Sequence, residues 1–72
     1  MKKKNIVGEN IQRVRRSMNL DQDELAARLS RLGWNCSENT ISKIEAGYRR
    51  IIDEEIALIA RALGVQPGDL FP

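Results

Sequence analysis

Histidine is absent from the chain, and Cys36 is its single cysteine. Without these side chains one chain cannot assemble a metal cage, a Ser/His/Asp relay, a Cys/His pair or an internal disulfide. The remaining residue types supply no cluster of nucleophile, base and oxyanion donors. We therefore expect no enzymatic activity, no bound metal and no cofactor.

Aromatic side chains and long apolar runs are also scarce. Trp34, Tyr48 and Phe71 are the only aromatics, and they are too scattered to form a stacking platform for RNA. No apolar run approaches the roughly 20 residues that span a bilayer. Polar residues follow Lys2–Lys4 where a secretion signal requires an apolar segment. The sequence predicts a cytoplasmic protein with no membrane partner and no small-molecule ligand.

The residues that are present suit one small domain. The 72 residues are 42% hydrophobic and 31% charged, with 12 basic against 10 acidic side chains and a net charge of +2. A chain of this length must concentrate its apolar residues in one compact core. We expect a basic tail over residues 1–5 and a single domain over residues 6–72.

Apolar residues recur at helical spacing, beginning with one stripe formed by Val7, Ile11, Val14 and Met18. Asp21 is suited to cap a second helix, which Gly33 ends. Ser37 is suited to cap a third helix, which Gly47 ends.

Acidic residues 53–55 open a fourth helix that ends at Gly64, and Gln66-Pro67 begins a last short turn carrying Leu70 and Phe71. No stretch alternates apolar and polar residues as a strand does. The pattern predicts an all-α fold with five helices around one core.

The acidic and basic residues are distributed differently. Seven of the ten acids lie at predicted helix starts, where carboxylates meet the positive end of the helix dipole: Asp21, Asp23, Glu24, Glu38, Asp53, Glu54 and Glu55. The basic residues gather in Lys2–Lys4, Arg13, Arg15, Arg16, Lys43, Arg49 and Arg50. A segregated basic surface is therefore compatible with a nearly balanced charge, although charge alone favours ordinary solvated side chains.

Four pieces of the sequence together resemble the helix-turn-helix domains of phage Cro and repressor proteins, the XRE-like family. They are VGENIQRVRRSMNL, DQDELAARL, SENTISKIEAG and EEIALIARALGVQPGDLF. In this family the third helix, called the recognition helix, lies in the DNA major groove, and the second crosses above it near the backbone. The resemblance implies a compact lambda-repressor-like fold and double-stranded DNA as the partner.

The chain departs from the family between Leu25 and Ile41, where it has about five residues more than the usual helix-turn-helix spacing. The extra material, Ser30–Cys36, is interpreted as an added turn of the second helix and a longer connection. Trp34 is interpreted as a hydrophobic plug over this connection, with stacking on a base or a partner as the alternative. Cys36 is expected to pack as a small apolar group rather than to act as a thiol switch.

The resemblance places base contacts on Ser37, Glu38, Asn39, Ser42 and Lys43 of the recognition helix. Asn39 is suited to pair with adenine, and Lys43 is suited to donate to guanine. Glu38 is awkward near phosphates, so it either accepts a hydrogen bond from cytosine or simply caps the helix.

Contacts with the DNA backbone have separate candidates. Gln22 stands where this family usually has a phosphate-binding glutamine, at a helix N-terminus that adds N–H donors. Tyr48, Arg49 and Arg50 directly follow the recognition helix, while Lys2–Lys4 form either a flexible arm on the DNA or a solvated tail. With about five phosphate contacts, log K falls with log salt at a slope of about −4 to −5.

Arg15 and Glu45 lie close to inner helix faces and match positions that form a buried or half-buried ion pair in the family. We assign this pair to structure. In a buried site, removal of one partner costs about 3–5 kcal/mol, so Glu45→Ala is expected to lose folding and DNA binding together.

The sequence predicts a DNA-binding transcriptional regulator, a repressor that binds a palindromic operator as a homodimer with half-sites about 34 Å apart. Val65, Leu70 and Phe71, or Leu58, supply the dimer surface or close the monomer core. The alternatives are an antitoxin-like protein-interaction module with the same fold and a restriction controller protein.

Overall fold

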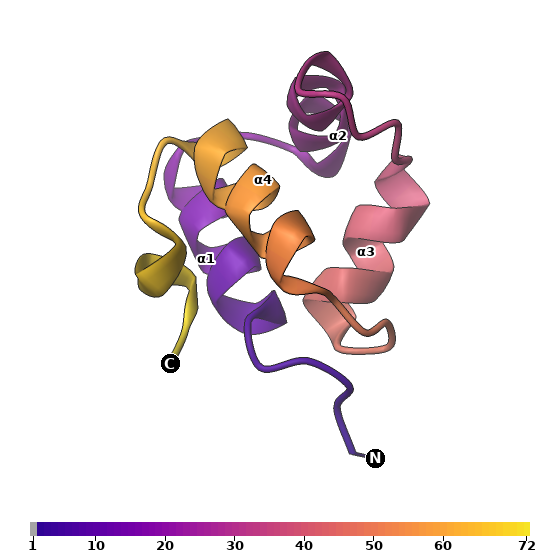
Figure 1. Cartoon of the computed structure of the whole chain (residues 1–72), viewed down its shortest axis with the longest axis vertical. Coiled ribbons are helices and arrows are strands. Elements are labelled where there is room, and N and C mark those ends of the chain that lie inside the picture. Colours follow the sequence, from indigo (N-terminus) through magenta and orange to yellow (C-terminus); the bar gives the residue numbers. More distant parts are fainter. Residues whose placement is uncertain (1) are drawn as a thin grey trace.

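The computed structural model describes residues 2–72, so Met1, the first residue of the predicted tail, lies outside it. The described chain forms four α-helices, α1 (Gly8–Ser17), α2 (Gln22–Arg31), α3 (Glu38–Ala46) and α4 (Asp53–Leu63), and a short 3-10 helix, η1 (Pro67–Leu70), with no strand (Figure 1). The predicted all-α fold is confirmed. The predicted count of five helices is slightly off, because the last element, expected as a short turn from Gln66-Pro67, is a 3-10 helix of four residues.

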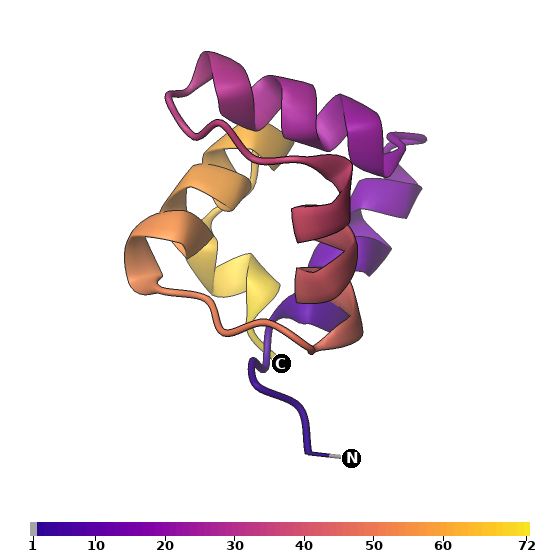
Figure 2. The same cartoon turned by 90° about the vertical axis from the view of Figure 1, so that its right-hand side faces the viewer.

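The helices pack around one shared core. Helix α1 contacts α3, α4 and η1, whereas α2 contacts α3 and α4. Figure 2 shows α2 lying across the ends of α3 and α4. Every element contributes at least one fully buried side chain, and the largest of these are Ile11, Leu25, Leu29, Ile41, Ile44, Ile59 and Leu70. Each such side chain stabilises the fold by about 1.5–3 kcal/mol relative to an exposed one.

Met18 departs from the predicted inner stripe, because its side chain is 40% exposed. Helix α1 ends at Ser17, so Met18 is already the C-cap residue and no longer follows the helical period. The buried positions of this stripe are Val7 and Ile11, with Val14 packed against the edge of the core.

The ends of the two helices that form the helix-turn-helix are capped as the sequence predicts. Asp21 accepts the backbone N–H of Glu24 at 2.8 Å, and Glu24 accepts the N–H of Asp21 at 3.1 Å. Ser37 accepts the N–H of Thr40 at 3.3 Å. Gly47 ends α3 with a φ of 82°, a left-handed conformation that costs glycine little. Sequence and structure therefore agree on both ends of the recognition helix.

Helices α1 and α3 approach each other closely at Gly8. A methyl group at this position would overlap the carbonyl oxygen of Ile44 and lie 3.0 Å from that of Glu45. The first turn of α1 thus lies against the last turn of α3 with no side chain between the two backbones.

Among residues 2–72, no helix is both long enough and apolar enough to cross a membrane.

Candidate nucleic-acid interface

The outward surface of α3 carries the side chains for which the sequence predicts base contacts. All five of these predicted residues are exposed: Ser37, Glu38, Asn39, Ser42 and Lys43. Ile41, Ile44 and Glu45 are buried on the opposite side. The helical period causes this separation, because residues three and four apart share a face. One face of α3 therefore holds the helix on the core, and the other offers polar tips to the solvent.

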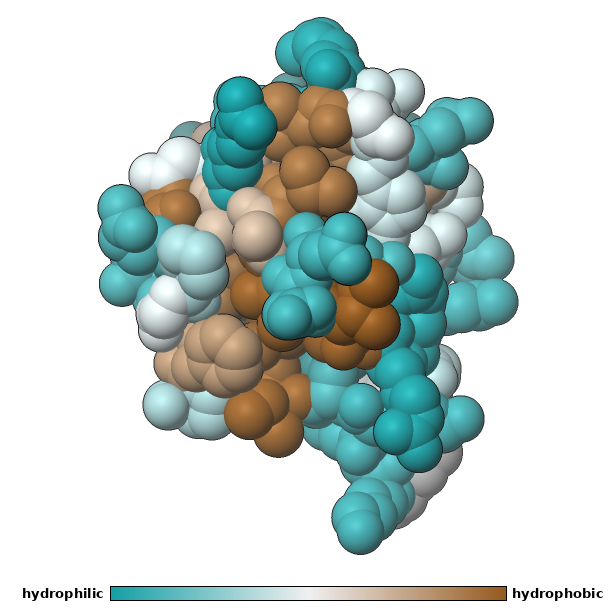
Figure 3. Space-filling model, viewed as in Figure 1, coloured by the Kyte–Doolittle hydropathy of each residue, from teal (hydrophilic) through white to brown (hydrophobic). Residues whose placement is uncertain are grey.

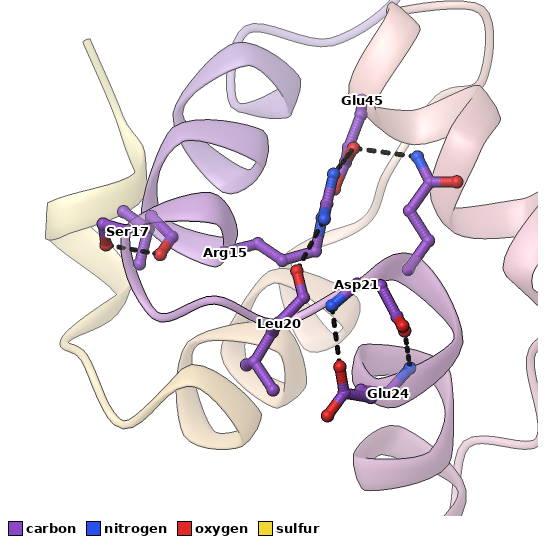
Figure 4. Close-up of polar contacts among 8 residues, drawn as sticks. Arg15, Ser17, Leu20, Asp21, Glu24 and Glu45 are labelled. Atoms are coloured by element: carbon purple, nitrogen blue, oxygen red, sulfur yellow. Dashed lines mark hydrogen bonds and ion pairs between the residues drawn. The ribbon is translucent and has the colours of Figure 1, made fainter.

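A buried ion pair joins α3 to α1 on the inner side (Figure 4). Arg15 Nε lies 2.7 Å from Glu45 Oε2, and Arg15 Nη2 lies 2.9 Å from Glu45 Oε1. The third donor, Arg15 Nη1, bonds the carbonyl oxygen of Leu20 at 2.7 Å. The two residues are only 6% and 4% exposed. The hydrogen bonds that Arg15 donates to Glu45 raise the pKa of the Arg15 guanidinium. The structure thus places these predicted partners in contact.

Gln22 is held by the same pair. Its Nε2 atom donates to Glu45 Oε1 at 3.0 Å, and its side chain is half-buried at the start of α2. An amide nitrogen carries two hydrogens, so one donor remains for another acceptor. Glu45 therefore holds Gln22 at the α2 N-terminus beside α3, where we predict a phosphate contact.

The three residues predicted to contact phosphates after α3 differ in their environments. Tyr48 is 58% exposed, and Arg50 is also exposed. Arg49 is half-buried, and its Nη1 and Nη2 atoms each lie 3.0 Å from an oxygen of Glu55. Arg49 Nη1 also donates to the carbonyl oxygen of Arg50 at 2.8 Å. Arg49 is therefore engaged within the protein, whereas Arg50 reaches the solvent.

Glu55 forms the other half of this second ion pair and also closes the start of α4. Its Oε1 atom accepts the backbone N–H of Ile52 at 3.1 Å. The hydrogen bonds from Arg49 lower the pKa of the Glu55 carboxyl, and the same contact raises the pKa of Arg49. The sequence had indicated Glu55 only as a helix-start carboxylate, so its partner was missed.

The connection between α2 and α3, residues 32–37, runs back from the end of α2 to the start of α3 (Figure 2). Its residue Trp34 packs against the core. Trp34 donates its backbone N–H to the carbonyl oxygen of Leu29 at 2.9 Å. The guanidinium carbon of Arg49 lies 5.8 Å from the centre of the indole ring, within the range of a cation–π contact. Trp34 therefore covers the connection and also braces the turn after α3.

Cys36 lies in the same connection and is half-buried against the core. Burial raises the pKa of its thiol. The neutral thiol is therefore the dominant form at neutral pH, as suits a small apolar packing group.

The segment before α1 is tied to the end of α3. The backbone N–H of Lys4 donates to the carbonyl oxygen of Gly47 at 2.8 Å, and Lys3 forms an exposed ion pair with Glu9. Asn5 contributes four side-chain hydrogen bonds. No role was predicted for Asn5, because a capping asparagine is expected directly before the first helical residue and Asn5 stands three residues before Gly8.

The whole arrangement agrees with comparisons to known proteins. A family model described as helix-turn-helix matches residues 11–70, from the second turn of α1 to the end of η1. No curated protein and no solved structure matched the chain. This family is of the XRE type, whose members are DNA-binding transcription regulators and are generally not enzymes. With four packed helices, a polar outer face on α3 and a family match over most of its length, the chain belongs to the XRE-type helix-turn-helix family of DNA-binding regulators.

Proposed function

We propose that the chain is a sequence-specific transcriptional repressor that occupies a palindromic operator as a homodimer. The observation that carries this proposal is the outer face of α3, where Asn39, Ser42 and Lys43 are exposed. Among the described residues these three side chains have no hydrogen-bond partner within the protein. An asparagine and a lysine on such a face match the donors and acceptors of the major groove.

Residues around α3 support contacts with the DNA backbone. Gln22 lies at the α2 N-terminus with one amide hydrogen free, and Tyr48 and Arg50 are exposed just after α3. The helix N-terminus adds N–H donors and a favourable dipole for a phosphate. Positioning contacts of this kind fix the register of a recognition helix but do not read the sequence.

The homodimer is supported by apolar side chains on the surface. One recognition helix reads only about four or five base pairs, so useful specificity favours two copies on two half-sites. Figure 3 shows hydrophobic residues gathered over α4 and toward the C-terminal end of the chain. Phe71 is 43% exposed and Ile52 is 56% exposed. Leu70 is fully buried and closes the monomer core, so Phe71 is the better candidate for the dimer surface.

Selection from random duplex DNA tests the proposal directly. We expect the wild-type chain to enrich a palindrome, to bind it with a salt slope of about −4 to −5, and to occupy it as two copies in light scattering. Asn39→Ala and Lys43→Ala are expected to lose this binding while remaining folded. If nothing is enriched, the repressor proposal fails and the protein-interaction alternative gains support.

A further inference from the structure

One side chain outside the family's recognition and turn residues connects three segments of the fold. The Oδ1 atom of Asn5 accepts the backbone N–H groups of Val7 at 3.1 Å and Gly8 at 2.7 Å, at the start of α1. Its Nδ2 atom donates to the carbonyl oxygens of Ile44 at 3.0 Å and Arg49 at 2.9 Å. The oxygen and the nitrogen of this amide therefore have separate roles. The oxygen caps α1, and the nitrogen holds α3 and the turn after it.

The carbonyl groups that Asn5 holds lie where the recognition helix ends. Ile44 is in the last turn of α3, and Arg49 is in the turn that also contains Tyr48 and Arg50. A helix leaves its last carbonyl groups without partners inside the helix. The carbonyl oxygen of Ile44 already accepts the backbone N–H of Gly47 at 3.0 Å, and the half-buried Asn5 amide supplies a second donor from a segment 39 residues away in the sequence.

Neighbouring contacts restrain the link between Asn5 and the end of α3 and extend it toward the N-terminus. At Gly8 the backbones of α1 and α3 touch, and the N–H of Lys4 donates to the carbonyl oxygen of Gly47. The aliphatic part of Lys3 lies over Gly47, so a methyl group there would be 2.9 Å from Lys3 Cγ. The residues before Asn5 thus run beside the C-terminal end of α3.

We infer that Asn5 is a positioning residue for DNA recognition: its Nδ2 donor sets the orientation of the end of α3 and of the turn that carries Tyr48 and Arg50. This inference rests on the proposed function. A rotation or shift of α3 changes which base edges Asn39 and Lys43 reach, because base readout depends on the register of the helix in the groove. Contacts with phosphates tolerate such a shift more easily than contacts with base edges.

Substitution by aspartate separates the two roles of Asn5. Asn5→Asp keeps an oxygen that caps α1, and its negative charge suits a helix N-terminus. It removes both N–H donors and places a carboxylate oxygen against the carbonyl oxygens of Ile44 and Arg49. If Asn5 were only a helix cap, Asn5→Asp would therefore keep the wild-type preference between two DNA duplexes, even though its added charge weakens binding to both.

The measurement is the ratio of two dissociation constants, one for the duplex that the wild type selects and one for a scrambled duplex of equal length. Circular dichroism first establishes that each variant is folded at the temperature used. We expect Asn5→Asp to reduce the preference for the selected duplex about tenfold, the size of effect that the loss of part-buried hydrogen bonds produces. Asn5→Ala is expected to reduce it similarly.

Two further variants make the result decisive. Ile6 is 67% exposed and its side chain makes none of the hydrogen bonds of Asn5, so Ile6→Asp adds the same charge one residue away and leaves those bonds in place. It is expected to weaken binding to both duplexes equally and to leave the ratio unchanged. Asn5→Ser adds no charge and can still cap α1, but its hydroxyl is too short to reach Ile44 and Arg49. It is expected to lose the preference as Asn5→Asp does, and it replaces Asn5→Asp if that variant does not fold.

The outcomes distinguish this inference from the proposed function. If the wild type enriches a duplex and both Asn5→Asp and Asn5→Ser retain its full preference, the inference is wrong and the proposed function stands. If the wild type enriches nothing, the proposed function fails, and this inference fails with it.

Discussion

The chain contains two arginine–glutamate pairs of the same chemistry in different surroundings. Arg15 and Glu45 have side chains that are 7% and 1% exposed and join α1 to α3. Arg49 and Glu55 have side chains that are 34% and 18% exposed and join the turn after α3 to the start of α4. Both arginines hold their carboxylate through two nitrogens, at distances between 2.7 and 3.0 Å.

Because the geometry of the two pairs is similar, we expect their different burial to set how much stability is lost when each pair is broken. A charge left alone in the core cannot be hydrated, so it costs several kcal/mol. A charge left alone near the surface is solvated by water at small cost. Stranding one charge of the inner pair is therefore expected to cost much of the folding stability, whereas breaking the outer pair is expected to perturb mainly the turn after α3.

The largest effect is expected for Glu45→Ala. This change leaves the Arg15 guanidinium buried without a counterion and removes the acceptor that holds Gln22. We expect a loss of about 3–5 kcal/mol in the free energy of unfolding, which is a large share of the stability of so small a domain. Urea denaturation followed by circular dichroism measures it.

A double variant controls for the charge itself. Arg15→Met combined with Glu45→Leu replaces the pair by apolar side chains, and it is expected to recover much of the lost stability. A Glu45→Ala chain as stable as the wild type would contradict the assignment of this pair to the core.

Lys43→Ala tests whether the two faces of α3 have different roles, because Lys43 lies two residues before Glu45 on the opposite, exposed side of this helix. We expect no change in melting temperature and a loss of about 1–3 kcal/mol in binding to the selected duplex. Fluorescence anisotropy with labelled duplex and a thermal melt give both quantities. Equal melting temperatures for Lys43→Ala and Glu45→Ala would remove the distinction between the two faces.

The contribution of the outer pair, Arg49 and Glu55, to the free energy of unfolding is expected to depend on pH. The pKa of Glu55 is lowered in the folded protein from its usual 4.5. The ion pair therefore stabilises the fold fully when the pH is above the usual pKa of 4.5. This stabilisation is lost as the pH falls through the lowered pKa of Glu55 in the folded protein. Glu55→Gln is expected to cost about 0.5–1 kcal/mol at neutral pH. Its difference from the wild type should shrink between about pH 5 and pH 3.

Urea titrations across this range, followed by the fluorescence of the single Trp34, measure the effect. Glu54→Gln is a matched control, because Glu54 is an exposed carboxylate one residue away. A difference between Glu55→Gln and the wild type that stays constant from neutral to acid pH would show that the ion pair is not its cause.

The smallest effect separates the two neighbouring arginines after α3. Arg50 is exposed, so Arg50→Ala is expected to reduce the steepness of the salt dependence of DNA binding by about 0.9, the value for one phosphate contact. Arg49→Ala is expected to change this slope less, because Glu55 and Trp34 hold Arg49. A larger change for Arg49→Ala would mean that Arg49 leaves Glu55 for a phosphate when DNA binds.

Local patterns in the sequence predicted most of the fold. Asp21, Ser37 and Gly47 mark helix ends through short-range hydrogen bonding and backbone conformation, which depend only on neighbouring residues. The prediction that Met18 lies on the inner stripe was wrong because the apolar period does not reveal where a helix ends. The final short turn was placed correctly at Gln66-Pro67, but it was counted as a fifth helix because proline at a first helical position does not distinguish an α-helix from one turn of 3-10 helix.

The candidate site was predicted less completely, and the reason is also physical. The helical period alone separates Asn39 and Lys43 from Ile41 and Ile44. The partners of Asn5 and Arg49 come from tertiary packing, which no local pattern specifies. Arg15 and Glu45 were paired by family resemblance, since their separation of 30 residues carries no signal of contact by itself.

The close approach at Gly8 has a consequence for how much variation the chain tolerates. In a library covering every single substitution, position 8 should accept glycine alone, since even the smallest side chain would meet the backbone of α3. Gly68 has open space around it and an ordinary backbone conformation, so many side chains should survive there. Two glycines in a chain with only five would thus stand at opposite extremes of mutational tolerance.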